Sequence, residues 1–217
     1  GLATKTPPET RKQMLSYPDM DQWLDAEQVE LEALRKKNTF GEILPESKMP
    51  KGTKAIGTRY VYTYRMKDGV ESHKARLVCQ GNQSKFGVDF SASHAETLNM
   101  TTLRMFLSYT AGQGGYHFRV TDIRTAFVTA PITREVYVRP PPGERDVDEN
   151  GERLVIKVNK ALYGMVDACR TFCRYLRQVL TKLGWKSCEV DPCLFRIQEG
   201  KNIAYSGRYI DDGVFAA

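Results

Sequence analysis

The sequence predicts an α+β fold, in which helices and antiparallel strands form separate parts of the chain. Three patterns carry this prediction: a strand–turn–strand signal over residues 59–78, helical spacing over 167–183, and successive strands over 193–216. The chain has 217 residues, of which 41% are hydrophobic and 27% charged, so it is long enough to bury a real core.

The first elements are a polar lead and an amphipathic helix. Residues 1–17 are polar with two prolines and are expected to be a flexible lead. A helix follows, with Asp19 expected as its N-cap and Asn38 as its terminator. Its apolar residues fall on roughly one face: Met20, Trp23, Leu24, Leu31 and Leu34.

A hairpin is expected next. Tyr60, Tyr62, Tyr64 and Met66 occupy alternate positions over 59–66, between Arg59, Val61, Thr63 and Arg65. Asp68-Gly69 supplies a tight turn, and residues 73–78 form the return strand. The return strand carries Lys74 and Arg76. Two interpretations of these cations stay open, a strand that reaches over phosphates and an ordinary solvated strand face.

The second half of the chain alternates helices and short strands. Residues 100–111 read as a helix that Gly112, Gly114 and Gly115 end, and a strand over 116–121 leads to Asp122. The further expected elements are a loop over 139–151, a strand over 153–158, a helix over 167–183 closed by Gly184, and strands over 193–197 and 203–210.

Composition restricts the class of partner and the compartment. The net charge of +6 and the pI of about 9.0 suit a polyanion, although a solvated basic surface gives the same values. The five cysteines include no CxxC pair, which indicates reduced thiols in an intracellular protein rather than a zinc site. No run of about 18 apolar residues is present, so no membrane span is expected.

Three aspartates are the candidate chemical residues. Asp211 and Asp212 adjoin in a turn between strands, where their repulsion is relieved by a cation such as Mg²⁺ or by solvent. Asp122 ends an earlier strand, and three acids at neighbouring strand ends can hold two metal ions for an in-line displacement. A nuclease or phosphohydrolase could use the same acids, and Asp is also common in plain hairpin turns.

An ordered series of segments resembles the copia-type retrotransposon reverse transcriptase from Asp21 to Ala217. The matching segments are residues 23–34, 56–62, 74–78, Asp122-Ile123-Arg124-Thr125-Ala126-Phe127, Pro141-Pro142-Gly143, Ala161-Leu162-Tyr163-Gly164, residues 191–195 and Tyr209-Ile210-Asp211-Asp212. Each segment alone is weakly specific, whereas the series in this order is highly specific.

The resemblance implies a role for particular residues. Asp122, Asp211 and Asp212 match the catalytic, metal-binding aspartates, with Mg²⁺ as the cofactor and Mn²⁺ as its substitute. The implied nucleotide-binding residues are Lys74 and Arg76 at the triphosphate, Phe127 as a steric gate under the sugar, and Tyr163 with Gly164 beside the nucleotide and template. A core position is the other interpretation of Phe127.

The resemblance also implies a right-hand fold with fingers and palm only. Fingers would cover 18–97 and 130–160, and a palm sheet backed by helices would cover 98–129 and 161–217, truncated after the catalytic hairpin. The implied function is RNA-directed DNA polymerase within a retrotransposon polyprotein. Its expected partners are an RNA or DNA template with primer, deoxynucleoside triphosphates, and the thumb, RNase H and integrase domains. The expected location is the cytoplasm or retrotransposon particles, with nuclear entry open.

Several positions depart from the family pattern. A Lys-Gln-Ala-Pro-like stretch is replaced by Val166-Asp167-Ala168-Cys169, and Ser206-Gly207-Arg208 replaces apolar residues, which is expected to weaken the strand before Asp211. His94, Glu96 and Asn99 replace the more usual Phe, Pro and Arg. An alternative function is therefore a non-catalytic remnant that keeps the fold and weak nucleic-acid binding.

Overall fold

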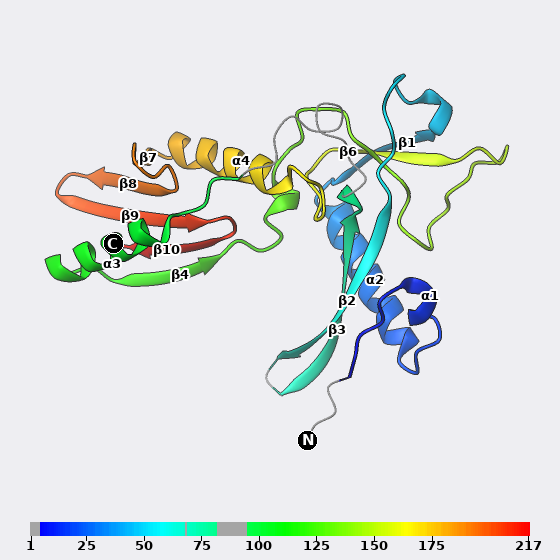
Figure 1. Ribbon diagram of the computed structural model, residues 1–217, viewed down its shortest axis with the longest axis horizontal. Coiled ribbons are helices and arrows are strands. Elements are labelled where there is room, and N and C mark those ends of the chain that lie inside the picture. Colours follow the sequence, from blue (N-terminus) through cyan, green and yellow to red (C-terminus); the bar gives the residue numbers. More distant parts are fainter. Residues whose placement is uncertain (1–4, 68, 82–94) are drawn as a thin grey trace. The chain divides into compact units, whose positions relative to one another are not determined.

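The computed structural model describes residues 5–67, 69–81 and 95–217 (Figure 1). The chain divides into two compact units. The first holds the described residues up to Gly81 with Pro131–Ala168, and the second holds those from Ala95 to Ala130 with Cys169–Ala217. Asp68 of the expected hairpin turn and the divergent His94 lie outside the described residues. Helices and antiparallel sheets occur together, as the predicted α+β class requires.

The N-terminal stretch of the first unit contains a short helix. Helix α1, Arg11–Met14, begins at Thr10, whose side chain accepts a hydrogen bond from the Gln13 N–H group. Met14 is fully buried, and the Arg11 guanidinium reaches the Glu27 carboxylate at 3.1 Å. The expectation of a flexible lead over residues 1–17 is therefore wrong for this part, because a buried side chain and an ion pair anchor it.

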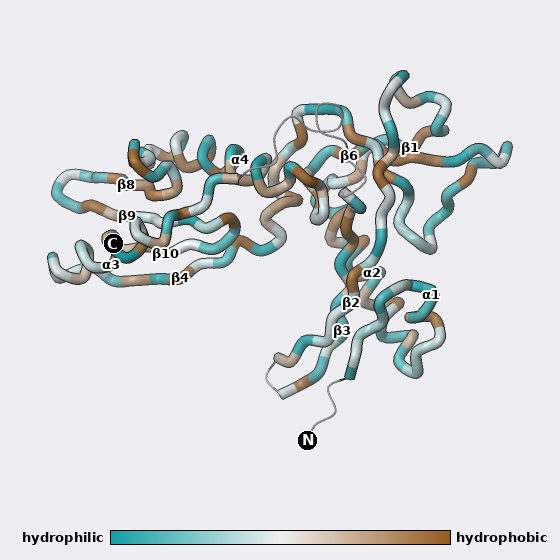
Figure 2. Tube along the Cα trace, viewed as in Figure 1, coloured by the Kyte–Doolittle hydropathy of each residue, from teal (hydrophilic) through white to brown (hydrophobic). Residues whose placement is uncertain are grey.

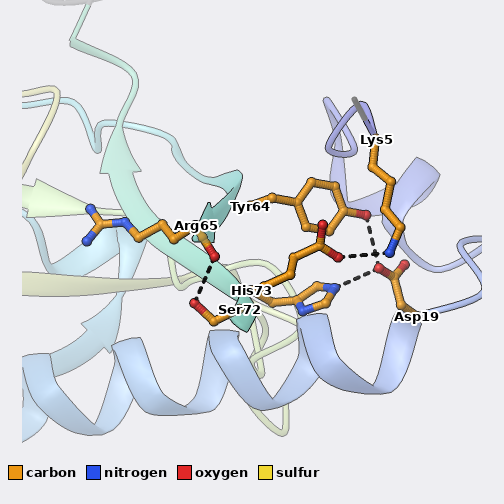
Figure 3. A network of polar contacts seen from close by, with 7 residues as sticks. Lys5, Asp19, Tyr64, Arg65, Ser72 and His73 are labelled. Carbon is orange, nitrogen blue, oxygen red and sulfur yellow. Dashed lines mark hydrogen bonds and ion pairs between the residues drawn. The ribbon is translucent and has the colours of Figure 1, made fainter. Parts of the chain in front are cut away.

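Helix α2, Met20–Lys36, follows the predicted bounds closely, but its start differs in detail. Asp19 stands at the N-cap position, yet its carboxylate is engaged by the Tyr64 hydroxyl at 3.0 Å and His73 Nε2 at 2.6 Å (Figure 3). The predicted capping bond is thus replaced by a contact to the hairpin. Asn38 ends the helix with a φ of 53°, as expected of a terminating residue in the left-handed region.

The predicted hairpin is formed by β2, Thr58–Lys67, and β3, Val70–Cys79, paired without a bulge. Tyr60 and Tyr62 are buried, whereas Met66 is exposed near the end of β2. The fully buried Trp23 of α2 packs edge-on against Tyr62 and His73, with ring centroids 5.3 and 4.4 Å apart. Helix α2 is therefore attached to the hairpin by an aromatic cluster beside the Asp19 contact.

A second sheet of the first unit has the strand order β1–β6–β5. Its strands are β1, Phe40–Pro45, β5, Tyr137–Val138, and β6, Leu154–Val158, and the short helix η1, Glu46–Lys48, follows β1. Leu44, Tyr137 and Val155 form its buried cluster. Figure 2 shows hydrophobic residues along β6, as expected of a central strand.

The second unit is built on an antiparallel sheet with the order β4–β10–β9–β8–β7 in the described chain. The strands are β4, Phe118–Asp122, β7, Lys186–Ser187, β8, Leu194–Glu199, β9, Asn202–Tyr209, and β10, Asp212–Ala216. β4 begins two residues later than predicted. β9 forms despite Ser206 and Arg208, so the expected weakening of this strand does not prevent its formation.

Helices cover both faces of this sheet. Helix α3, Met100–Gln113, places Phe106 beside Gly207, and Asn99 caps it through the Thr101 N–H group at 2.8 Å. Gly112 lies inside α3, so the predicted break is wrong there, and the helix ends at Gly114. Helix α4, Ala168–Lys182, runs along the sheet (Figure 1) and packs Phe172 with Ile210. Gly184 follows α4 with a φ of 88°, as predicted.

Two further features concern the state of the cysteines and the character of the helices. Cys79, Cys169, Cys173, Cys188 and Cys193 are all free thiols, as the sequence indicates. Across the described helices, none combines the length and the apolar character that a membrane crossing requires.

Candidate active site

The turn between β9 and β10 presents the two adjacent aspartates. Tyr209 pairs with Asp212, so Ile210 and Asp211 form a two-residue turn. Ile210 has a φ of 56°, which is a strained conformation for a β-branched residue and costs on the order of 1–3 kcal/mol. Its side chain packs against the buried cluster of Ala126, Ala130 and Phe172. Apolar packing beneath the turn therefore holds a backbone shape that the turn would not adopt alone.

Strand β4 brings the third aspartate to the same end of the sheet. Asp122 lies directly opposite Asp212 in the antiparallel pair, and the Ile123 N–H group donates to the Asp211 carbonyl at 3.0 Å. Directly opposed residues in such a pair share one face of the sheet. Asp122 and Asp212 are exposed and Asp211 is half-buried. Asp122 and Asp212, which are 90 positions apart in the sequence, thus become neighbours.

The donor chemistry of this group suits a divalent cation. Carboxylate oxygens are the ligands that Mg²⁺ and Mn²⁺ prefer. Within residues 5–67, 69–81 and 95–217, however, no three His, Cys, Asp or Glu side chains are grouped closely enough to hold a metal ion. The backbone therefore gathers the three acids, while their side chains do not close around a common centre.

The aspartates of the turn affect the pKa values of two neighbouring side chains, Cys169 and Arg208. Burial, and then the negative charge of Asp211, raise the pKa of the Cys169 thiol on α4. Burial lowers the pKa of Arg208, and the charges of Asp212 and Asp211 oppose that change. The turn is therefore negative toward its surroundings, as a site for a cation must be.

Phe127 lies five residues after Asp122, in the short helix η3, Phe127–Thr129. Its ring meets Phe172 edge-on at 6.1 Å and packs on the cluster under the turn, yet the residue is only half-buried. A core contact and partial exposure of the residue are thus both present. Both interpretations from the sequence, steric gate and core residue, remain compatible with this position.

The predicted phosphate-binding cations belong to the first unit, on β3. Lys74 Nζ lies 3.8 Å from a Glu30 carboxylate oxygen, and the Arg76 guanidinium stacks over the Tyr163 ring at 4.6 Å. Glu30 is nearly buried and also accepts the Leu77 N–H group at 3.2 Å. Burial raises the pKa of Glu30. Both cations thus have partners inside their own unit.

Gly164 is required by the backbone of the first unit. Its φ is 81°, and a Cβ there would lie 2.1 Å from the Cys79 carbonyl oxygen. The Cys79 N–H group donates to the Tyr163 carbonyl at 2.7 Å. The Tyr163-Gly164 segment is therefore docked on the end of β3, and only glycine fits without displacing that strand.

Divergent positions have structural partners in their own units. Asp167 accepts two hydrogen bonds from Arg134 at 3.1 and 3.0 Å, and Glu96 pairs with Arg177 on α4. Sequence patterns do not predict three features of these surroundings: Glu30 as a partner of Lys74, Thr121 as a partner of Arg208, and Gly213 as the residue that leaves room for Arg208. A glycine directly after Asp211-Asp212 was the one sequence signal for the last of these.

Comparison of the sequence with known proteins identifies the family of the chain. A family profile described as "Reverse transcriptase (RNA-dependent DNA polymerase)" matches residues 43–217. The chain therefore belongs to the reverse transcriptase family. It is 30% identical over 214 residues to the retrovirus-related Pol polyprotein from transposon RE1 of Arabidopsis thaliana, covering 98% of this chain.

Two further relatives are also transposon polyproteins. The chain is 30% identical over 210 residues to the Pol polyprotein from transposon TNT 1-94 of Nicotiana tabacum, covering 94% of this chain. It is 28% identical over 172 residues to the transposon Ty1-BL Gag-Pol polyprotein of Saccharomyces cerevisiae, covering 73% of this chain. The matched region spans 14%, 15% and 9% of the RE1, TNT 1-94 and Ty1-BL polyproteins.

Proposed function

We propose that this chain is the fingers-and-palm part of an RNA-directed DNA polymerase that acts within a retrotransposon polyprotein. The observation that carries the proposal is the pairing of Asp122 with Asp212 beside Asp211 at one end of the sheet. Family membership supports the reaction class. In this proposal the fingers comprise residues 18–97 and 130–160, and the palm comprises 98–129 and 161–217.

In the proposed reaction, a primer 3′-hydroxyl attacks the α-phosphorus of a deoxynucleoside triphosphate, which forms a phosphodiester bond and releases pyrophosphate. Bound Mg²⁺ or Mn²⁺ would supply activation of the hydroxyl and charge neutralisation on the triphosphate. Asp122, Asp211 and Asp212 would hold the cations at the sheet end, and the pairing of β4 with β10 fixes the spacing of their main chains. The strained Ile210 turn, held by its apolar cluster, would keep Asp211 in place during turnover.

Residues of the first unit would bind the nucleotide and template. Lys74 and Arg76 would contact the triphosphate, which requires them to exchange their present partners Glu30 and Tyr163 for phosphate oxygens. Tyr163 and Gly164 would lie beside the nucleotide and template, and Phe127 of the second unit would restrict the sugar. The template–primer duplex and the thumb, RNase H and integrase domains of the polyprotein are the proposed partners, in the cytoplasm or in particles.

Incorporation of one labelled deoxynucleotide on a primed RNA template, with Mg²⁺ or Mn²⁺, tests the proposal. We expect Asp122→Asn and Asp211→Asn to lower the rate by at least about 100-fold, since each removes a carboxylate that would hold the cations which stabilise the anionic transition state. Glu149→Gln, an exposed acid in the loop before β6, is the matched control and should leave the rate unchanged. A rate that survives both aspartate changes would contradict the assignment.

A second candidate function is a non-catalytic remnant that retains the fold and weak nucleic-acid binding. It is favoured by the buried Arg208 behind the aspartates and by side chains that do not converge in the described chain. Filter binding of the same primed template separates the two functions. Template binding without incorporation, in either metal, identifies the remnant.

A further inference from the structure

The buried side chain of Arg208 lies next to the acidic turn, in the residue pair that follows Tyr209–Asp212 along the sheet. Along the sheet, Tyr209, Asp212 and Asp122 form one cross-strand row, and Arg208, Gly213 and Thr121 form the next. Successive rows face opposite sides of a pleated sheet, so Arg208 points away from the face of Asp122 and Asp212. Only 6% of Arg208 is exposed. A full positive charge is therefore enclosed directly beneath the candidate site.

Gly213 creates the space that the guanidinium occupies. A Cβ at position 213 would lie 2.1 Å from Arg208 Nη1 and 3.1 Å from Thr121 Oγ1. Across this gap, Nη1 donates a hydrogen bond to Thr121 Oγ1 at 3.1 Å. The Arg208 side chain thus crosses β10 at Gly213, the glycine of that strand. Arg208 in this position therefore depends on glycine at position 213.

The surroundings of Arg208 do not compensate its charge directly. The guanidinium lies over the Phe215 ring at 5.5 Å, and Leu176, Phe195 and Ile210 line the same small cavity. In the described parts of the chain, its Nε has no hydrogen-bond partner and no carboxylate reaches it within ion-pair distance. A buried charge without a paired counter-charge is costly, so its retention here calls for a compensating interaction.

The remaining source of compensation is the turn itself. Asp212 and Asp211 are the acids that act electrostatically on Arg208, whereas Glu96, which lines the same cavity, is paired with Arg177. Charges interact more strongly through a protein interior than through water. Attraction between Arg208 and the two aspartates would also offset the repulsion between those aspartates.

We propose that Arg208 is a permanent internal counter-charge of the Asp211–Asp212 turn, which keeps the turn formed without a metal and weakens its affinity for divalent cations. The part about affinity rests on the proposed function; the electrostatic coupling does not. The guanidinium lies on the opposite face of the sheet from Asp122 and Asp212. It therefore repels a dication bound by those aspartates without occupying the metal-binding position itself. Arg208 is accordingly a positioning residue, which acts through the aspartates.

The coupling is tested without metal by unfolding a set of four chains in EDTA: wild type, Arg208→Met, Asp212→Asn and the double variant. Met matches the length of the buried stem and lacks the charge. In the Met background we expect Asp212→Asn to raise the unfolding midpoint, because it removes repulsion that is no longer offset. In the Arg background the same change should leave the midpoint unchanged or lower it. Strictly additive effects would overturn the coupling.

The affinity is tested by Mn²⁺ titration followed by electron paramagnetic resonance. We expect Arg208→Met to tighten Mn²⁺ binding by about tenfold, because a nearby positive charge repels a dication even after partial screening. Arg208→Lys, which keeps the charge, should bind as the wild type does. A chain with Asp211→Asn and Asp212→Asn defines binding elsewhere and is subtracted.

Three outcomes separate the inference from the proposed function. Tighter binding in Arg208→Met, together with the coupling, supports the inference. If Arg208→Met and the wild type bind Mn²⁺ with equal affinity, and Asp211→Asn with Asp212→Asn abolishes that binding, the inference is overturned and the metal site stands. Mn²⁺ binding that no aspartate change affects contradicts the metal site, and the inference about affinity fails with it.

Discussion

The two units treat buried charge differently. In the first unit, the buried Glu27 is bound by Arg11 at 3.1 Å and by the Tyr62 hydroxyl at 2.5 Å, so this buried charge has direct partners. In the second unit, the buried Arg208 has the Thr121 hydroxyl and the Phe215 ring as neighbours, and its acidic counter-charges are the more distant aspartates. Paired burial in the first unit holds the helix on the hairpin. Incomplete pairing in the second unit marks the position where chemistry is proposed.

The largest effect is expected from Glu27→Ala. Removing Glu27 leaves the Arg11 guanidinium without its counter-charge in a largely buried position. We expect this to lower the free energy of unfolding by about 3 kcal/mol. Glu32→Ala, at an exposed position of the same helix, is the control and should change stability by less than about 0.5 kcal/mol. Urea denaturation followed by circular dichroism measures both. Equal losses in the two variants would show that Glu27 has no special role.

Arg208→Met should have a much smaller effect on stability. The variant loses attraction to the aspartates but also removes a charge that is incompletely compensated, and apolar replacements of buried ions are often neutral. We expect a change within about 1 kcal/mol of the wild type in the same urea experiment. A loss as large as that of Glu27→Ala would mean that Arg208 is paired as fully as the charges of the first unit.

Two carboxylates at α2 should respond to pH with opposite sign. Burial raises the pKa of Glu30 above 4.5, so its contribution to stability is full below 4.5 and is lost as the pH rises through the folded value. Desolvation raises the pKa of Asp19, but hydrogen bonds from His73 and Tyr64 outweigh it and leave the pKa below 3.8. The contribution of Asp19 is therefore present above 3.8 and is lost as the pH falls.

Melting temperatures between pH 3 and 7 measure both contributions. The wild type should lose stability relative to Glu30→Gln as the pH rises from about 4.5. Relative to Asp19→Asn, it should gain stability as the pH rises from 3 toward 5. If the two differences in melting temperature, wild type minus Glu30→Gln and wild type minus Asp19→Asn, changed in the same direction with pH, the described surroundings of Glu30 or of Asp19 would be wrong.

The smallest effect concerns thiol reactivity. Burial raises the pKa of Cys79 and of Cys193 to about 12, so little thiolate is present near neutral pH. At pH 8, mass spectrometry after brief alkylation should find both unmodified while the half-exposed Cys188 has reacted. Chain denatured in urea, in which all five thiols react, is the control. Early modification of Cys79 or Cys193 would show that the native core opens at that strand.

Local patterns predicted most elements of the fold. The spacing of Trp23, Leu31 and Leu34 gave α2, and Gly69 with alternating tyrosines gave the β2–β3 hairpin. Asp19 occupies the predicted N-cap position, but its carboxylate does not cap the helix because Tyr64 and His73, which lie far away in the sequence, bind it instead. A capping rule describes local competition for a carboxylate, whereas here distant residues of the hairpin take it.

The sequence predicts candidate residues for the site, and their roles stay predictions, but it does not predict how those residues are arranged. Asp122, Asp211 and Asp212 were found from their positions at strand ends and from family resemblance. Their pairing depends on the register of β4 with β10, which is a non-local property. The sequence likewise identified Arg208 as unusual, but the space for its side chain becomes visible only when Gly213 is placed beside it.

Paramagnetic broadening by Mn²⁺ would locate the cation site in the ¹⁵N-labelled chain. If the three aspartates form that site, the amide signals of Ile123, Asp212 and Gly213 disappear first as Mn²⁺ is added, and they persist when Asp211→Asn and Asp212→Asn are combined. Broadening that begins instead at the acidic loop over residues 146–149, or that spreads evenly over exposed acids, would contradict the assignment of these aspartates as the metal-binding residues of a polymerase.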